Sequence, residues 1–404
     1  MRRVSLFIIS FLSWALISAQ DKNVPDWQEG MLDIHTIATG RGNCQFLIFP
    51  DGTTMMIDAG DFDGKGYDNK YSPMRCTVVD ESLTPAQKIS EYIKSINGDF
   101  SKEIDYFLLT HFHTDHYGAV RDGLPLNNEG DYYLTGLTEL AEYIPINKII
   151  DRGFPTYDFP LNLQNRLTKN GTLLDPSFEN YLKFVKYKEK NKSLEREEFV
   201  LGDGQFKLKY TPDKFPNFKV SNIKVNNLLW DKDSDKAKVL FTSDEFLGEN
   251  NKFSENPLSC AIVIEYGDFK YYAGGDNTGL VDQDHEKFLD IETPMSEVIG
   301  NITAMTLNHH GNRDATNLEF LKTLDPKVVI LQSWSSDHPG QENAHRLISP
   351  NIGENKREIY MTNLDPLTGL GIGPWFEKNL TGANCHVLLR VLPDGSYKTF
   401  TIDI

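Results

Sequence analysis

A run of metal-ligand residues directly behind a predicted strand constrains this chain more than any other feature. Residues 110–116 read THFHTDH, so three histidines and one aspartate fall within six residues. Residues 104–109 before this run are mainly apolar and aromatic and have polar neighbours, which is typical of a buried β-strand. The run is therefore expected to form a loop at the carboxyl end of a strand, where layered α/β proteins usually bind ligands.

The spacing within this run suits divalent metal ions. His111 and His113 are two residues apart, so in an extended segment their side chains point the same way. Asp115 and His116 follow where the chain turns, and they can reach a second ion. Imidazole and carboxylate groups bind zinc and neighbouring ions, and two ions about 3.5–4 Å apart can generate hydroxide and stabilise developing charge. A solvated polar loop is the alternative, but four ligand-type residues so close together favour a metal site.

The same run resembles the metallo-β-lactamase fold superfamily, and other blocks follow in the order of that family. Strands expected at 31–38, 44–49 and 53–58, with a PDG turn before the last and an IDAG sequence at its end, resemble the opening of the family's domain. The chain is most similar to the hydrolase-domain branch of DNA-uptake competence proteins, although that branch usually has acidic residues in place of Ala38 and Asn43. The resemblance implies an α/β fold, a four-layer αββα sandwich with its site at one edge.

The resemblance also implies roles for residues beyond the run. Asp276 follows a predicted strand and two glycines, as does the family aspartate that bridges both metals. In residues 308–311, NHHG, His310 is expected to be a ligand and His309 to contact the substrate or donate a proton, although the reverse order remains open. The expected metal ligands are thus His111, His113, Asp115, His116, Asp276 and His310.

Supporting and catalytic residues complete the expected site. Asp58, in the IDAG sequence, is expected to support the metal loop through hydrogen bonds, with an ordinary turn aspartate as the alternative. His338 precedes a proline and is expected to lie near the mouth of the site. Asp115 or His309 is expected to manage protons, so both are candidate catalytic residues.

One ligand of many superfamily members is missing. No histidine occurs between His116 and His285, the interval in which many members place a third metal-binding histidine. The first metal would then keep His111, His113 and Asp276 together with water or substrate. The competence-like branch often lacks this histidine too.

The two ends and the middle of the chain indicate its domain organisation. Two arginines, an apolar run over 4–17 and small residues before position 20 predict a signal peptide, residues 1–19, with an uncleaved anchor as the alternative. No later stretch is long and apolar enough to span a bilayer, so a secreted or periplasmic protein is expected. One metallo-β-lactamase-like hydrolase domain is expected over 30–404, with an insertion of loops and a small helical part at about 151–255.

Local patterns predict further elements. Helices are expected at 84–96, 137–143 and 176–189, a short strand at 148–150, and two strands within 198–212. The stretch 213–258 is charged, and its pattern does not place helices or strands. The aromatic residues of the insertion are expected either to line a substrate pocket or to pack in the core: Phe154, Tyr157, Phe159, Trp230, Phe246 and Phe253.

Composition narrows the expected function. The formal net charge of −17 opposes binding to long nucleic acid, and the four cysteines have no C-x-x-C spacing typical of a zinc knuckle or redox motif. The resemblance implies a hydrolase with two divalent ions, zinc first and manganese or iron as alternatives, that activate water as hydroxide. A small-molecule or headgroup phosphoester is the expected substrate. A lactone, β-lactam or thioester hydrolase, or a non-catalytic metal-binding secreted protein, remains the alternative, and the sequence does not indicate an oligomeric state.

Overall fold

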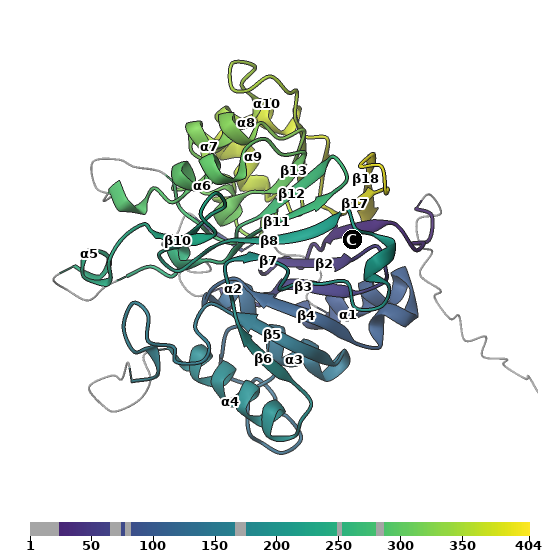
Figure 1. Cartoon of the computed structure of the whole chain (residues 1–404), viewed down its shortest axis with the longest axis vertical. Helices are drawn as coiled ribbons and strands as arrows, with labels where there is room; N and C mark the ends of the chain where they lie inside the picture. The colour runs from purple at the N-terminus through teal and green to yellow at the C-terminus, as the bar shows by residue number, and fades with distance from the viewer. Residues whose placement is uncertain (1–23, 65–73, 77–81, 166–174, 249–252, 280–286) are drawn as a thin grey trace, which may run out of the picture.

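The computed structural model describes residues 24–64, 74–76, 82–165, 175–248, 253–279 and 287–404 (Figure 1). The expected signal peptide, residues 1–19, lies outside these ranges. Within the ranges, no helix has both the length and the apolar character that crossing a bilayer would need.

The first of two sheets contains the amino-terminal strands and the last two strands of the chain. Its order among the described residues is β18-β17-β1-β2-β3-β4-β5-β6. The bounds are β1 Leu32–Thr36, β2 Cys44–Ile48, β3 Thr54–Ala59, β4 Ile104–Leu109, β5 Ile146–Asp151, β6 Glu195–Glu198, β17 Cys385–Val391 and β18 Tyr397–Asp403. Strands β3 to β6 are parallel, so their carboxyl ends share one edge of the sheet.

The second sheet has the order β10-β9-β8-β11-β12-β13-β14-β15-β16, and β7 pairs with β8 beside this path. The bounds are β7 Gly202–Asp203, β8 Phe218–Val225, β9 Leu228–Asp231, β10 Lys236–Val239, β11 Ala261–Tyr266, β12 Phe269–Ala273, β13 Ala304–Thr306, β14 Val328–Leu331, β15 Glu358–Met361 and β16 Gly382–Ala383. Strands β12 to β16 are parallel, so this sheet also has an edge where carboxyl ends meet.

The two sheets pack face to face over a shared apolar core. Ile262 and Ile264 of β11 belong to this core, together with Leu47 and Leu389 of the first sheet. Val263, between the two isoleucines, belongs instead to the core beneath the outer helices. Because successive strand side chains point to opposite faces, β11 is buried on both sides.

Helices cover the outer face of each sheet (Figure 1). Helices α1, α3 and α4 lie on the first sheet, and α6, α7 and α8 lie on the second. The bounds are α1 Pro85–Ile96, α2 Thr114–Tyr117, α3 Gly136–Tyr143, α4 Pro176–Lys190, α5 Ser243–Leu247, α6 Glu292–Ile299, α7 Leu318–Leu324, α8 Gln341–Ile348, α9 Pro366–Ile372 and α10 Pro374–Glu377. The expected four-layer αββα sandwich is confirmed.

Local signals located the helices on the first sheet. The α1 helix begins after Thr84, whose Oγ1 accepts from the Gln87 N–H at 3.2 Å, while Gln87 Oε1 accepts from the Thr84 N–H at 2.9 Å. This reciprocal pair satisfies two backbone donors at the start of the helix. The helices expected at 137–143 and 176–189 are α3 and α4, and the strand expected at 148–150 is the middle of β5.

The region 195–258 differs from the prediction. Two strands were expected within 198–212, but β6 ends at Glu198 and β7 contains only Gly202–Asp203. No element was predicted over 213–258, yet this stretch forms β8, β9, β10 and α5, and β8 pairs with β11 inside the second sheet. The sequence did not place β8 because this strand buries Asn222 and Lys224, polar residues that interrupt the apolar pattern of a strand.

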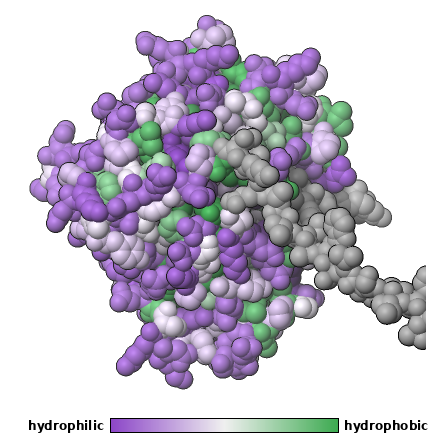
Figure 2. Space-filling view, turned by 90° about the vertical axis from the view of Figure 1, so that its right-hand side faces the viewer, coloured by the Kyte–Doolittle hydropathy of each residue, from purple (hydrophilic) through white to green (hydrophobic). Residues whose placement is uncertain are grey.

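The drawn face of the molecule is mainly hydrophilic (Figure 2). Figure 2 shows one face of the molecule, on which hydrophilic residues predominate and hydrophobic residues form small scattered groups.

Candidate metal centre

The metal loop, residues 110–116, leaves the end of β4 and enters the short helix α2. Asp58, near the end of the neighbouring strand β3, accepts from Thr110 N at 2.9 Å and from Thr110 Oγ1 at 2.8 Å. Its Oδ2 also lies 2.7 Å from His116 Nδ1. Asp58 therefore holds the proton of His116 on Nδ1 and leaves Nε2 free to face the centre.

The six predicted ligands come together in two groups that share one carboxylate. Asp115, His116, Asp276 and His310 form one group, and His111, His113 and Asp276 form the other. Within each group, the potential ligand atoms all lie within 4.8 Å of one another. Residues far apart in the sequence thus meet at the edge where the carboxyl ends of β4 and β12 lie.

Asp276 is the point at which the two groups meet. Its Oδ2 lies 3.2 Å from His116 Nε2, 3.4 Å from His310 Nε2 and 3.7 Å from His111 Nε2. Burial raises the pKa of the Asp276 carboxyl, but the imidazoles of His116 and His310 outweigh it and hold the pKa well below its usual range. The carboxylate form, which binds cations, is therefore favoured.

Several buried polar atoms of this centre have no hydrogen-bond partner among the described residues. His111 Nε2, His116 Nε2 and Asp276 Oδ1 are all in this state. An unsatisfied buried polar atom costs about 1–3 kcal/mol, so a concentration of them at one point needs a reason. Burial lowers the pKa of His111 well below its ordinary value, which favours the neutral imidazole that ligates metals. These side chains therefore fit a divalent cation.

The fold and this centre agree with one known family. The model of the metallo-β-lactamase superfamily matches residues 39–212, which include Asp58 and the metal loop. The chain has the metallo-β-lactamase fold.

Two solved structures are similar to the chain. Zn²⁺-bound PqqB from Methylobacterium extorquens has 12% identity and a TM-score of 0.35, with 75% of this chain and 88% of PqqB covered. A putative zinc-dependent hydrolase of the metallo-β-lactamase superfamily from Thermotoga maritima has 10% identity and a TM-score of 0.32, with 82% of this chain and 98% of that chain covered. None of the curated proteins compared with the chain matches it.

Within this metallo-β-lactamase fold, the side chains of the two neighbouring histidines in the NHHG block have different partners. His310 Nε2 lies 2.9 Å from Asp115 Oδ2, and its Nδ1 donates to the Gln332 carbonyl at 2.9 Å. His309 points elsewhere: its Nδ1 lies 2.5 Å from Asp314 Oδ1. His310 thus belongs to a group of potential ligand atoms, whereas His309 is not in either group among the described residues. Which of the two histidines binds a metal stays a prediction.

A cavity of about 290 Å³ opens in front of the centre. It is lined by Phe62, Phe112, His113, Thr114, Asp115, Asp175, Asp276, His309, His310, Asn312, Trp334 and His338. This volume suits a small molecule or one headgroup of a larger molecule. The six aromatic residues of the expected insertion pack in the two cores beneath the outer helices. None of them is among the described residues that line this cavity.

His338 lies behind the centre as well as beside the cavity. Its side chain is buried, and its ring stacks on that of His310 with the centroids 4.6 Å apart. Trp334 Nε1 lies 3.3 Å from His310 Nε2 on another side. Burial and the charge of His310 lower the pKa of His338 well below its ordinary value, so His338 stays neutral and orients its neighbour by packing.

The interval between His116 and His285 contains a buried lysine, Lys224, that supports the centre and that the sequence did not reveal. Lys224 Nζ donates to the carbonyls of Pro257 and Ser259 and to Asn277 Oδ1. Ser259 Oγ in turn accepts from the Asp276 N–H at 3.0 Å. Lys224 therefore connects the two segments that position Asp276. No local sequence pattern could predict this role, because the partners of Lys224 lie 33 to 53 positions away.

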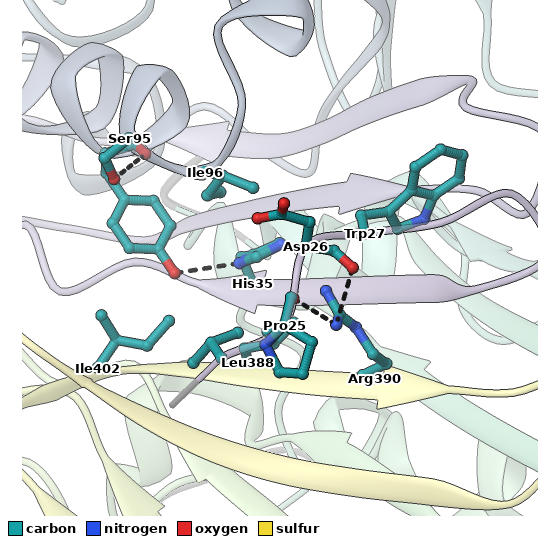
Figure 3. Close-up of a pocket in the computed structure, with 11 residues that line it drawn as sticks. Pro25, Asp26, Trp27, His35, Ser95, Ile96, Leu388, Arg390 and Ile402 are labelled. Atoms are coloured by element: carbon teal, nitrogen blue, oxygen red, sulfur yellow. Dashed lines mark hydrogen bonds between the residues drawn. The ribbon is translucent and has the colours of Figure 1, made fainter. Parts of the chain in front are cut away.

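A second cavity lies at the first sheet, between β1, β17 and α1 (Figure 3). His35 Nδ1 lies 3.0 Å from the Tyr92 hydroxyl, and the Arg390 guanidinium binds both oxygens of Asp33 at 2.7 and 2.6 Å. The cavity measures about 40 Å³, which is enough for buried water but small for an organic substrate. His35 and its neighbours therefore have a structural role.

Proposed function

We propose that this protein is a secreted or periplasmic metal-dependent hydrolase that cleaves small-molecule or headgroup phosphoesters at this centre. The observation that carries the proposal is the pair of ligand groups that share Asp276, because a carboxylate with two oxygens can bind one ion with each. Buried ligand atoms without hydrogen-bond partners support the same proposal. The signal-like segment 1–19 is the basis for the proposed secretion.

The two groups assign parts to the side chains. His111, His113 and Asp276 would hold one ion, and Asp115, His116, Asp276 and His310 the other. When bound, divalent ions such as zinc, manganese or iron supply an activated water molecule and withdraw charge from the substrate. The first group has three protein ligands, so it keeps a position open for water or substrate, as catalytic zinc sites do.

The residues of the cavity complete the proposed chemistry. Asp115 borders both the second ligand group and the cavity, so its carboxylate can accept a proton from water there. His309, held by Asp314, lies on the cavity wall and can contact the substrate or pass a proton to the leaving group. Phe62 and Trp334, whose ring centroids are 4.6 Å apart, form an apolar wall that limits access of water.

The proposed substrate class follows from size and charge. A cavity of about 290 Å³ admits one small ester or headgroup, and a formal net charge of −17 repels long nucleic acid. The choice of a phosphoester rests on the resemblance to the competence-protein branch. The fold also serves lactone, β-lactam and thioester hydrolysis, so these substrates are the alternatives within the same centre.

The test is hydrolysis of bis-(p-nitrophenyl) phosphate by the protein without residues 1–19, with zinc or manganese. His111→Ala removes one ligand and should abolish metal-dependent turnover. His345→Ala is the matched control, because His345 stacks on Trp375 outside the centre, with ring centroids 4.4 Å apart.

Three outcomes are informative. Turnover that His111→Ala loses and His345→Ala keeps would support the phosphoesterase. Turnover of a lactone, lactam or thioester alone would move the substrate class and keep the centre. Metal binding without hydrolysis of any of these substrates would refute the enzyme and favour a non-catalytic metal-binding protein.

A further inference from the structure

The loop that carries His309 and His310 has an unfavourable backbone conformation. It runs from the end of β13 to the start of α7. His309, His310 and Thr316 have φ values of 44°, 54° and 53°, in the left-handed region that residues with a side chain rarely adopt. Such conformations cost free energy and persist only where the surrounding structure holds them.

Glu292, on α6, holds this loop at both ends. Its Oε1 accepts from Asn308 Nδ2 at 2.7 Å and from the Thr316 N–H at 2.6 Å. Its Oε2 accepts from the Asn317 N–H at 2.6 Å. The side chain is completely buried, so a single carboxylate joins the residue before the two histidines to the two residues that close the loop.

Other side chains support this arrangement without entering the ligand groups. The Tyr272 hydroxyl donates to Asn308 Oδ1 at 2.9 Å, which fixes the orientation of the amide that binds Glu292. Asn343 Nδ2, on α8, donates to three carbonyls in the middle of the loop, at residues 311, 312 and 315. The loop is therefore tied from one side through its N–H groups and from the other through its carbonyls.

The space for the Glu292 carboxylate is also specific. A Cβ atom built at Gly279 would lie 2.0 Å from Glu292 Oε2, so only glycine permits this close approach. Burial raises the pKa of Glu292 to about 7, whereas the three converging N–H groups favour the ionised form. A buried carboxylate of this kind needs a reason, and its bonds all lead to the loop of His309 and His310.

We propose that Glu292 is a positioning residue that sets the metal affinity of the group Asp115, His116, Asp276 and His310. It acts through Asn308 and the 316–317 backbone, which hold His310 Nε2 within reach of Asp115 and Asp276. Metal ligands tolerate displacements of only a few tenths of an ångström, so a loosened loop binds an ion more weakly. This inference rests on the proposed metal centre and does not depend on the substrate.

The experiment compares zinc binding by the protein without residues 1–19 and by its Glu292→Gln variant, in competition with a chromophoric chelator. Glutamine keeps the shape, but its NH₂ group must face at least one of the three N–H donors, so a hydrogen bond is lost. The second group should lose about 10–100-fold in zinc affinity, while the group His111, His113 and Asp276 should change by less than about threefold. Glu297→Gln, an exposed position on the same helix, is the matched control and should bind zinc as the unmodified chain does.

A purely structural role would give a different result. It would lower the melting temperature of the metal-free protein and leave both zinc affinities unchanged, and that result would overturn the proposal. If Glu292→Gln does not fold, the same zinc competition is measured with Tyr272→Phe, which removes only the hydroxyl that orients Asn308. A smaller loss of zinc affinity at the second group supports the proposal, and an unchanged affinity overturns it.

The outcome is separable from that of the proposed function. A chain that binds zinc at both groups but hydrolyses no ester refutes the enzyme, while the Glu292→Gln comparison still stands. A chain that binds no zinc at all overturns the inference, since the loop would then have no ion to position.

Discussion

Replacing Asp58 by asparagine tests whether the centre depends on the tautomer of His116. Asp58 accepts three hydrogen bonds, two from Thr110 and one from His116 Nδ1 at 2.7 Å. An asparagine can keep the bond to the Thr110 N–H with its oxygen, but its NH₂ group then faces His116 Nδ1. His116 would have to accept there and carry its proton on Nε2, the atom that faces Asp276. The imidazole would then no longer offer a lone pair to a metal ion.

The expected loss of zinc affinity is that seen when a metal-binding histidine loses its hydrogen-bond partner. Such changes weaken metal binding by about 10–100-fold, or about 1.4–2.7 kcal/mol. Zinc competition with a chelator measures this directly, and loss of bis-(p-nitrophenyl) phosphate turnover at limiting zinc should follow it. The ¹⁵N chemical shifts of His116 in the zinc-bound protein report independently whether Nδ1 carries the proton. The zinc-bound form is needed because burial lowers the pKa of His116, but the carboxylates of Asp276 and Asp115 outweigh it and raise that pKa well above its ordinary value when no ion is bound.

Asp105→Asn is the matched control for this variant. Asp105 is a buried carboxylate in β4 that binds Thr54 N at 2.8 Å and Lys209 Nζ at 2.5 Å, outside the ligand groups. This variant should lower the free energy of unfolding without changing the zinc affinity. If Asp58→Asn folds and binds zinc as tightly as the unmodified chain, Asp58 does not set the tautomer of His116.

Two further perturbations test the electrostatics of the molecule. Burial lowers the pKa of His310, but Asp276 and Asp115 outweigh it and raise the pKa to about 10, so an ion must displace a proton there. Zinc affinity should therefore rise as the pH rises toward 10, by up to about tenfold per pH unit for each proton displaced; a pH-independent affinity in zinc competition assays would contradict this. At the first sheet, Arg390→Met leaves Asp33 buried without its partner and should lower the free energy of unfolding by about 3–5 kcal/mol in urea denaturation. The double variant Asp33→Asn with Arg390→Met should recover part of that loss, and equal stability of both variants would show that the ion pair is not the cause.

Short-range patterns were sufficient for the parts of the protein that depend on neighbouring residues. The metal loop was recognisable because His111, His113, Asp115 and His116 follow a strand within a few positions. Helix α1 was recognisable because the cap at Thr84, the proline at its first position and the apolar spacing all lie inside one short segment. Such features are properties of local geometry, which the order of residues determines directly.

Residues whose partners are distant could not be assigned in the same way. Lys224 and Glu292 appear in the sequence as ordinary surface charges, yet both are fully buried and hold segments of the centre in place. Strand β8 was missed for the same reason, because its buried polar residues break the alternation that predicts a strand. What stabilises such residues is a hydrogen bond to a group that only the folded chain brings near.

The sequence by itself determined the residue types of the candidate centre, their order along the chain and the sandwich fold that brings them together. Only the tertiary structure decided which of the two neighbouring histidines faces the centre. His310 reaches Asp115 across 195 positions of sequence, whereas His309 turns toward Asp314 only five positions away. The two histidines are adjacent and chemically identical, so the difference between them arises from the left-handed backbone and the contacts that hold it, neither of which a linear pattern contains.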